Sequence, residues 1–312
     1  MTRSAARSTL APRSASDPPY VPAPPARLAP GFFEKAMMIR SGLVGRSILA
    51  SRSPDLHQGE GRALGLEVSY ELFDFTARDL PDSALAEVIG TLRDDGFAGF
   101  NVTYPFKQAI VPLLDELDES ALAVGAVNTV AIREGRLIGY NTDMIGFRLS
   151  MEQGLPGARL ERVVQLGAGG AGAAVANALL SLGVRRLVLV DVDPARAEQL
   201  RSELAARFPG QDVECGAPGT LDTTGADGIV NATPIGMNGK PGMPLPPEKI
   251  AARQWVADII YFPRETELLR VAKSKGCATI NGVGMVVGQA ARAFEIITGH
   301  AADARRMRAM LD

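Results

Sequence analysis

Short apolar stretches of strand type alternate with amphipathic stretches of helical type through most of the chain. In the first half, strands are expected over GLVGRSI, VSYELFDF and GFNVTY, with helices over PDLHQGEGRALG and DSALAEVIGTLRDDG between them. Two extended pieces, AVNTVAIRE and RLIGYNT, then meet at Gly135 and predict a hairpin at the edge of the sheet. Strands that are separated by helices predict a parallel sheet.

A second series of strands begins at about residue 143. Its apolar stretches are RVVQLG, RRLVLVD, DGIVNAT, WVADII and CATING, again with helices between them. The pattern therefore predicts two α/β domains, each with a parallel sheet. We place the first domain at 36–142 and the second at 143–283. A final helix over 284–298 has no strand after it and is expected to pack back on the first domain, which then includes 284–312.

The first 35 residues differ in composition from the rest of the chain. They are rich in Ala, Pro, Arg and Ser, and Asp17 and Glu34 are their only acidic residues. Such a segment cannot bury a core, so residues 1–35 are expected to be disordered. A targeting peptide, or a true start at Met37 or Met38, is the alternative.

The overall charge limits the kinds of partner. With 46% hydrophobic residues, 22% charged residues and a formal net charge of -2, the chain has no general electrostatic reason to bind nucleic acid or an anionic membrane. The uncharged stretch 163–184 is long enough to resemble a membrane span, but its glycines would break such a helix. The expected partners are small molecules, with no nucleic acid and no membrane.

The few cysteines and histidines argue against a metal site. Cys215 and Cys277 lie far apart without metal-type spacing, and the only histidines are His57 and His300. The sequence therefore predicts a reduced, cytoplasmic protein without a metal.

The strongest local motif opens the second series of strands. The stretch VVQL ends at Gly167, and the pattern Gly167-x-Gly169-x-x-Gly172, with Gly170 inside it, leads into an apolar helix. The first glycine permits a tight turn, the second lets the backbone approach a pyrophosphate, and the third lets helix and strand pack closely. A glycine-rich turn without a ligand is the alternative.

The next strand, RRLVLVD, ends in Asp191, about two dozen residues after the turn begins, where an acidic residue hydrogen-bonds the ribose 2′-hydroxyl of a dinucleotide. An aspartate there also repels a 2′-phosphate, so the expected cofactor is NAD rather than NADP. A contribution of Arg196, in the following helix, to binding a phosphate stays open.

A lysine stands at an unfavourable place in the first half. In NVTYPFK the apolar stretch stops at Pro105, and if this proline opens a helix, the partial positive charge of the helix N-terminus repels Lys107. Asp143, in GYNTDMIGF, is either a helix N-cap, a role that Thr142 could take instead, or a partner for Lys107. If both segments face one cleft, Asp143 would orient Lys107, and the pair could exchange a proton with an alcohol. A structural role and a catalytic role both stay open.

The stretch LASRSPDLH predicts a helix start. Ser53 is expected as the N-cap and Pro54 as the first helical residue. Because Ser51 lies two positions earlier, the two hydroxyls and the free backbone donors could bind a carboxylate; an ordinary capped loop is the alternative. His57, one turn into the helix, is expected to serve packing or a local hydrogen bond rather than catalysis.

The order of the motifs resembles that of a known family. From about Gly42 to the C-terminus, the chain is similar to the shikimate and quinate dehydrogenase family in SRSPDLH, GFNVTYPFKQ, LGAVNTV, GYNTDMIGF, LGAGGAG, VNATPIGM, YFPRETELL and GMVVGQAARAFEIITG. The resemblance implies an N-terminal α/β substrate domain, a Rossmann-type dinucleotide-binding domain and a cleft between them. It also implies reversible oxidation of a ring hydroxyl of shikimate or quinate to 3-dehydroshikimate or 3-dehydroquinate, with hydride passing to a nicotinamide.

The resemblance further implies roles for single residues. The catalytic pair would be Lys107 and Asp143. The residues that contact the substrate would be Ser51, Ser53, Thr103, Asn128, Tyr261 and Gln289, with Asn101 and Thr142 in the same motifs. The residues that contact the cofactor would be Gly167, Gly169, Gly170, Gly172, Asp191, Thr233 and Met237.

One departure from the family pattern concerns the cofactor. NADP-using members look like Asn-Arg-Thr where this chain has Asp191, Val192 and Asp193, so the arginine that would pair with the phosphate is missing. This pattern and DIIYFPRETELL resemble the NAD-dependent quinate/shikimate dehydrogenase branch, which mainly degrades these compounds. Ser53 stands where some quinate-active relatives look to carry threonine, so the choice between shikimate and quinate stays open.

Two other functions stay open at this point. One is an NAD oxidoreductase for a related ring substrate such as aminoshikimate, and the other is a non-catalytic sensor on the same scaffold. Whether the protein forms a homodimer stays open. The sequence also does not decide whether the reaction runs in the biosynthetic direction of the shikimate pathway or in the breakdown of these compounds.

Overall fold

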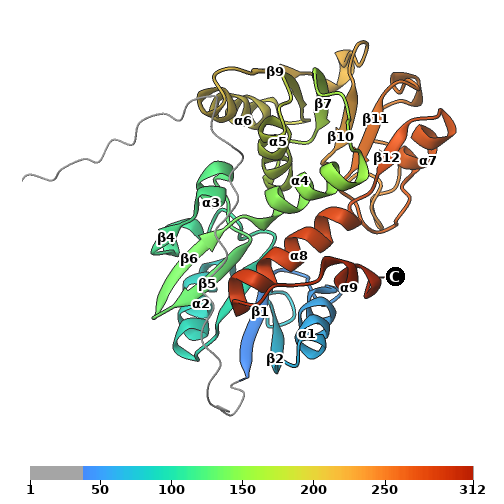
Figure 1. The fold of residues 1–312 in the computed structure, drawn as a ribbon. Coiled ribbons are helices and arrows are strands. Elements are labelled where there is room, and N and C mark those ends of the chain that lie inside the picture. The colour runs from blue at the N-terminus through green and yellow to red at the C-terminus, as the bar shows by residue number, and fades with distance from the viewer. Residues whose placement is uncertain (1–37, 312) are drawn as a thin grey trace, which may run out of the picture. The chain divides into compact units, whose positions relative to one another are not determined.

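The computed structural model describes residues 38–311. The disorder predicted for residues 1–35 falls outside this range. Within it, the main strands form two six-stranded sheets (Figure 1). Among residues 38–311, no helix has the length and apolar character needed to cross a membrane.

The first sheet has the strand order β2-β1-β3-β5-β6-β4. Its strands are β1 (Ile39–Gly45), β2 (Val68–Asp74), β3 (Gly99–Val102), β4 (Glu116–Leu117), β5 (Thr129–Arg133) and β6 (Arg136–Tyr140). Strand β1 is parallel to β2 and β3, but β5 is antiparallel to both β3 and β6. The strands that helices separate, β1 to β3, are parallel as predicted, and β5 of the predicted hairpin makes this sheet a mixed one.

The predicted hairpin is confirmed. Strands β5 and β6 are joined through Glu134 and Gly135, which have positive φ angles of 52° and 77°, as tight hairpin turns require. The hairpin does not form the edge, because the two-residue strand β4 pairs with the outer side of β6. The helices of this half are α1 (Ser53–Ala63), α2 (Leu85–Asp94) and α3 (Glu119–Val124).

The second sheet has the order β12-β11-β10-β7-β8-β9, and every pair is parallel. Its strands are β7 (Arg162–Leu166), β8 (Arg186–Val190), β9 (Asp212–Gly216), β10 (Gly228–Asn231), β11 (Trp255–Asp258) and β12 (Ala278–Ile280). Strands β8 and β9 follow β7 on one side of the sheet. The chain then crosses to β10, on the other side of β7, and adds β11 and β12 beyond it. This is the doubly wound dinucleotide-binding order, whose ligand site lies at the switch between β7 and β10. Strand β9 was not among the predicted strands.

Helices cover both faces of the second sheet. They are α4 (Thr142–Gly154), α5 (Gly170–Ser181), α6 (Pro194–Arg207) and α7 (Glu267–Ser274). Helix α8 (Val283–Thr298) follows β12. Successive side chains of a strand point to opposite faces. Val163 accordingly joins one buried cluster with Leu179 of α5, whereas Val164 joins another with Leu269 of α7.

Glycines let α4 and α8 lie directly against each other (Figure 1). A Cβ added to Gly146 of α4 would lie 2.4 Å from the carbonyl oxygen of Met285 in α8. A Cβ added to Gly288 would lie 2.9 Å from the Cα of Gly146. The close crossing brings the first turn of α4 near the middle of α8, and both places contribute to the site described below.

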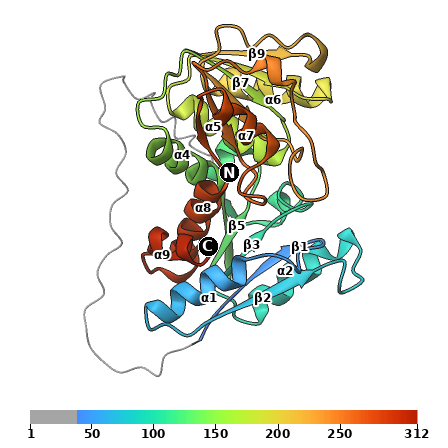
Figure 2. The ribbon, with the colours of Figure 1, turned by 90° about the vertical axis from the view of Figure 1, so that its right-hand side faces the viewer.

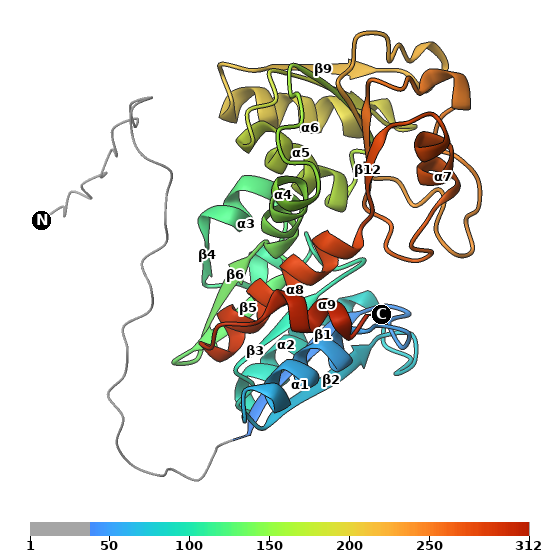
Figure 3. The same ribbon diagram turned by 45° about the vertical axis from the view of Figure 1, so that its right-hand side comes forward.

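Helix α8 returns to the first sheet, where it contacts α1, β3 and β5. The prediction that the final helix packs back on the first half is therefore confirmed. A short helix that was not predicted, α9 (Ala304–Ala309), follows it and lies beside α8 and α1 (Figures 2 and 3).

A buried carboxylate fastens α9 to α1. Glu60 of α1 is fully buried and accepts hydrogen bonds from Arg306 Nε (2.7 Å) and Nη2 (2.6 Å). It also accepts one from the backbone N–H of Asp303 (2.7 Å). The hydrogen bonds to Glu60, together with its negative charge, raise the pKa of the Arg306 guanidinium. The last helix thus depends on one residue that lies far away in the sequence.

We expect Glu60→Ala to lower the free energy of unfolding by roughly 2–3 kcal/mol, because it removes a fully buried side chain and leaves part-buried donors and a cation without their acceptor. Urea denaturation followed by circular dichroism measures the change. Glu71→Ala is the matched control, since Glu71 also pairs with an arginine, Arg78, at 2.7 Å, but on the surface. That control should cost about 1 kcal/mol or less. Equal losses in the two variants would contradict the prediction.

Candidate active site

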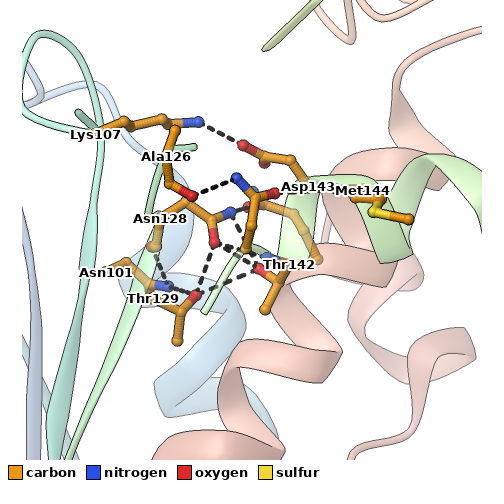
Figure 4. A network of polar contacts seen from close by, with 10 residues as sticks. Asn101, Lys107, Ala126, Asn128, Thr129, Thr142, Asp143 and Met144 are labelled. Atoms are coloured by element: carbon orange, nitrogen blue, oxygen red, sulfur yellow. Dashed lines mark hydrogen bonds and ion pairs between the residues drawn. The ribbon is translucent and has the colours of Figure 1, made fainter. Parts of the chain in front are cut away.

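Lys107 and Asp143 form an ion pair, with Nζ 2.6 Å from Oδ2 (Figure 4). The lysine side chain keeps 23% of its exposure and the aspartate side chain 7%. A charge-assisted hydrogen bond in such a partly enclosed place holds both groups in one orientation. The contact expected between these two residues is present.

Lys107 does not lie in a helix. Residues 104–110 form successive turns, followed by the short 3₁₀ helix Val111–Leu113, so the helix predicted from Pro105 is wrong. An α-helix from that point would hold Pro112 in its interior, where the missing N–H and the ring disrupt the helix. The turns are anchored instead by Val127, whose N–H donates to the carbonyl of Lys107 at 2.8 Å.

Asp143 lies in the first turn of α4, where the helix dipole favours a carboxylate. The N-cap is Asn141, whose Oδ1 accepts from the N–H of Met144 at 3.3 Å, so neither Asp143 nor Thr142 is the cap. The Asn141 Nδ2 donates to the carbonyl of Ala126 at 3.0 Å. Asn141 therefore fixes the corner between β6 and α4 and leaves Asp143 free to meet the lysine.

A network of amides and hydroxyls lies next to the ion pair (Figure 4). Asn128 Oδ1 accepts from the N–H of Thr142 at 2.7 Å, and its Nδ2 donates to Gln289 Oε1 at 3.1 Å. Asn101 Nδ2 donates to the carbonyl of Asn128 at 3.2 Å and to Thr129 Oγ1 at 3.0 Å. These bonds join β3, β5, α4 and α8, which lie far apart in sequence, into one rigid wall.

A cavity of about 440 Å³ brings the predicted substrate and catalytic residues together. Its lining includes all eight of them: Ser51, Ser53, Thr103, Lys107, Asn128, Asp143, Tyr261 and Gln289. Asp143 is the only carboxylate of the lining, and Lys107 and Arg52 are its only lysine and arginine. Such a site suits a small polar molecule with one negative charge.

The hydroxyls of Ser51 and Ser53 lie together at the start of α1. Ser51 Oγ accepts from the N–H of Ser53 at 3.2 Å and donates to Ser53 Oγ at 3.1 Å. Helix α1 begins at Ser53, so the prediction of Ser53 as N-cap is wrong; the N-cap is Arg52, whose side chain makes no capping bond. Two hydroxyls, a helix N-terminus and a guanidinium together suit a carboxylate ligand.

The glycine-rich turn joins β7 to α5 at the switch point of the second sheet. Gly167 has a φ of +98°, and a Cβ there would lie 2.7 Å from the carbonyl oxygen of Ala232. A Cβ on Gly172 would lie 2.3 Å from the carbonyl oxygen of Gly167. Gln165 Nε2 donates to the carbonyls of both glycines, at 2.9 and 2.8 Å. The turn is thus closed tightly enough that only glycine fits at 167 and 172.

The outer glycines of the turn face open space. A Cβ on Gly169 or Gly170 would meet no atom within 4 Å, and both residues line a cavity of about 770 Å³. Gly169 is the N-cap of α5 and offers no side chain to the first amides, which stay available for an anion. The residues present therefore fit a pyrophosphate.

The two cavities share a wall. Thr233 lines the larger cavity, while Met237 and Tyr261 line both. Thr233 Oγ1 donates to Asn231 Oδ1 at 2.7 Å and accepts from the N–H of Ile235 at 3.2 Å, which holds this loop in place. The larger cavity thus extends from the glycine turn to the ion-pair cavity.

Comparison with known proteins agrees with this geometry. The profile of the shikimate dehydrogenase substrate binding domain matches residues 43–130, and that of the shikimate 5′-dehydrogenase C-terminal domain matches residues 282–311. The shikimate dehydrogenase (NADP(+)) of Arthrobacter sp. strain FB24 is 48% identical over 270 residues, which are 86% of this chain and 92% of that protein. The chain belongs to the shikimate dehydrogenase family.

Other members of the shikimate dehydrogenase family that resemble this chain use NAD. The quinate/shikimate dehydrogenase (NAD(+)) of Corynebacterium efficiens is 43% identical over 271 residues, 86% of this chain and 95% of that protein. The structure of quinate dehydrogenase from Corynebacterium glutamicum in complex with NAD superposes with a TM-score of 0.83 at 40% identity, covering 88% of this chain and 98% of the other. The predicted family, the two-domain α/β fold and a nicotinamide dinucleotide cofactor are thereby confirmed.

In this member of the shikimate dehydrogenase family, two aspartates, Asp191 and Asp193, follow strand β8. Asp191 Oδ2 accepts from the N–H of Ala168 at 2.7 Å, and its Oδ1 accepts from that of Asp193 at 2.9 Å. Arg196 lies 3.6 Å from Asp191 and 3.4 Å from Asp193. Val192, between the two aspartates, is 85% exposed. Arg196, the guanidinium that residues 38–311 place here, is thus already paired with two carboxylates.

Asp258, at the end of β11, was not among the predicted site residues. Its carboxylate accepts from Asn231 Nδ2 (3.0 Å), from the N–H of Ile260 (3.1 Å) and from Thr266 Oγ1 (2.7 Å). Burial raises the pKa of Asp258 to about 6, although these hydrogen bonds act against the shift. The residue joins the loops that follow β10 and β11, which carry Met237 and Tyr261. Its position at a strand end next to the cofactor motifs was the available signal.

The described residues contain no group of three or more His, Cys, Asp or Glu side chains placed to hold a metal ion.

Proposed function

We propose that this protein transfers a hydride between NAD and a ring hydroxyl of shikimate or quinate, forming 3-dehydroshikimate or 3-dehydroquinate. The observation that carries the proposal is that the Lys107–Asp143 pair and the Ser51–Ser53 hydroxyls line one cavity, which shares a wall with the cavity of the glycine turn. We further propose that 36–142 with 284–312 is the substrate domain and that 143–283 is the cofactor domain.

The cavity lining would orient a hydroxylated ring acid. The hydroxyls of Ser51 and Ser53 would hold the carboxylate, with Tyr261 beside them. Thr103, Asn128 and Gln289 would contact the ring hydroxyls. Asn128 is already bonded through both atoms of its amide, so its main contribution is to hold Gln289 and the start of α4 in position.

Lys107 would manage the proton of the reacting hydroxyl. A bound nicotinamide dinucleotide, held by Gly167, Gly169, Gly170 and Gly172 with Asp191, Thr233 and Met237, would supply the hydride acceptor. In oxidation, Lys107 accepts the hydroxyl proton, and Asp143 holds its ammonium at 2.6 Å. In reduction, the ammonium returns this proton to the oxygen of the developing alkoxide.

The charges near β8 support NAD over NADP. A 2′-phosphate at this place would meet the carboxylates of Asp191 and Asp193, and Arg196 is already shared between them. Relatives of both cofactor types resemble this chain. The percentage identity to these relatives therefore does not distinguish NAD from NADP, whereas the charges of Asp191, Asp193 and Arg196 favour NAD.

The test is the initial rate of nicotinamide reduction with shikimate and with quinate, each with NAD and with NADP. We expect turnover with NAD and at least tenfold lower kcat/KM with NADP, which corresponds to about 1.4 kcal/mol. Val192→Arg should raise kcat/KM for NADP about tenfold and leave that for NAD nearly unchanged. Val192→Gln, long but uncharged, is the matched control. A wild-type preference for NADP would contradict the cofactor assignment, and no turnover with either acid would contradict the function.

A further inference from the structure

His57 is a buried histidine in the wall of the substrate cavity. It lies one turn after Ser53 in α1 and is 2% exposed. Its ring stacks on Tyr70, with centroids 4.6 Å apart, and lies 6.0 Å from Phe294. These contacts fix the ring plane, so any polar role of His57 has a defined direction.

The ring nitrogens of His57 have no hydrogen-bond partner among the described residues. Nδ1 is enclosed by protein atoms and is one of only two such unpartnered side-chain atoms in residues 38–311. Burial lowers the pKa of His57 to about 3, so the imidazole is neutral near pH 7, with one donor and one acceptor nitrogen. Nδ1 stays without a partner inside the protein, whereas Nε2 is neither enclosed nor hydrogen-bonded among the described residues and is therefore open to a molecule in the cavity.

The neighbouring polar groups do not need His57. Tyr70 donates its hydroxyl proton to Asn101 Oδ1 at 2.8 Å, and Asn101 donates in turn to the carbonyl of Asn128 at 3.2 Å. The network that supports the site is therefore complete without the imidazole. Since Nδ1 is enclosed, Nε2 is the nitrogen that remains for a molecule in the cavity.

We propose that His57 donates a hydrogen bond from Nε2 to a hydroxyl on the ring carbon that carries the substrate carboxylate, and so favours acids that are hydroxylated at that carbon. This rests on the proposed function. Residues four apart share one face of a helix, so His57 lies beside Ser53. If Ser51 and Ser53 hold the carboxylate, the carbon that bears it is the part of the ring nearest to His57. Quinate has a tertiary hydroxyl on this carbon, whereas in shikimate the same carbon is part of a double bond.

The test compares the two acids in wild type and in His57→Phe, which keeps a ring for stacking but has no nitrogen. We expect kcat/KM for quinate to fall about tenfold and kcat/KM for shikimate to change less than threefold. Calorimetric titration without cofactor should show the same selective loss in quinate affinity. Melting temperatures show whether the variant is folded, and His57→Leu is the second variant if His57→Phe does not fold.

Gln58→Ala is the control for a change in α1, because Gln58 lies next to His57 but outside the cavity lining. It should leave both acids unaffected. Equal losses for quinate and shikimate in His57→Phe would place the contact at the carboxylate and overturn the proposal, as would unchanged kinetics. A wild-type enzyme that neither binds nor oxidises quinate overturns it as well. If wild type oxidises one of the acids, the proposed function stands even when the proposal for His57 fails.

Discussion

Replacing Lys107 by Ala is expected to lower kcat for oxidation of the ring hydroxyl by about 10²–10⁴-fold, the usual contribution of a positioned acid–base group. The affinity for NAD should change little, because Lys107 lines the cavity of the ion pair and not the cavity of the glycine turn. Steady-state kinetics and a separate titration of NAD binding distinguish the two effects. Near-normal turnover in this variant would contradict the proton-transfer role.

The partner residue gives a sharper test. Asp143→Asn removes the carboxylate that lies 2.6 Å from the ammonium but keeps a side chain of the same shape. Since the two residues act as one unit, the double variant should lose little more activity than Lys107→Ala alone. Lys273→Ala, which breaks an exposed pair with Glu265, is the matched control and should keep full activity. Additive losses from Lys107 and Asp143 would mean that the two residues act independently.

The sequence pattern predicted those parts of the fold that depend on local order. The glycine turn follows a buried strand and opens a helix, so its residues could be identified one by one, and the strand order places it at the switch point. Family motifs indicated eight substrate and catalytic residues, and all eight are among the residues that line one cavity. The grouping of Thr103 and Lys107 with Asp143 was predictable, because these residues follow strand ends of one sheet. The place of Gln289, within helix α8, depends on the close crossing of α4 and α8.

The missed features depend on contacts between distant segments. The amphipathic pattern after Pro105 resembles a helix, but Pro112 and the bond from Val127 to the Lys107 carbonyl favour turns. Strand β4 has two residues, too few for any periodic pattern. Gly146 and Gly288 look like ordinary helix interruptions until α4 and α8 are seen to cross there.

Replacing Gly172 by Ala is expected to damage both stability and cofactor binding. The new Cβ would lie 2.3 Å from the carbonyl oxygen of Gly167, and neither backbone can yield without opening the turn. We expect a loss of about 2–3 kcal/mol in the free energy of unfolding, as in other overpacked sites. The displaced first turn of α5 should also weaken NAD binding by at least tenfold, about 1.4 kcal/mol. Urea denaturation and titration of NAD measure the two losses.

Two other glycines separate the causes of these losses. Gly90→Ala, in helix α2, meets no atom within 4 Å and should stabilise the protein by roughly 0.5–1 kcal/mol, since alanine loses less backbone entropy on folding. Gly170→Ala also meets no protein atom, but its methyl group would enter the cofactor cavity. It should therefore weaken NAD binding with little loss of stability. Wild-type stability and NAD affinity in Gly172→Ala would show that helix α5 need not approach β7 so closely, and the explanation of the turn by close packing would then be wrong.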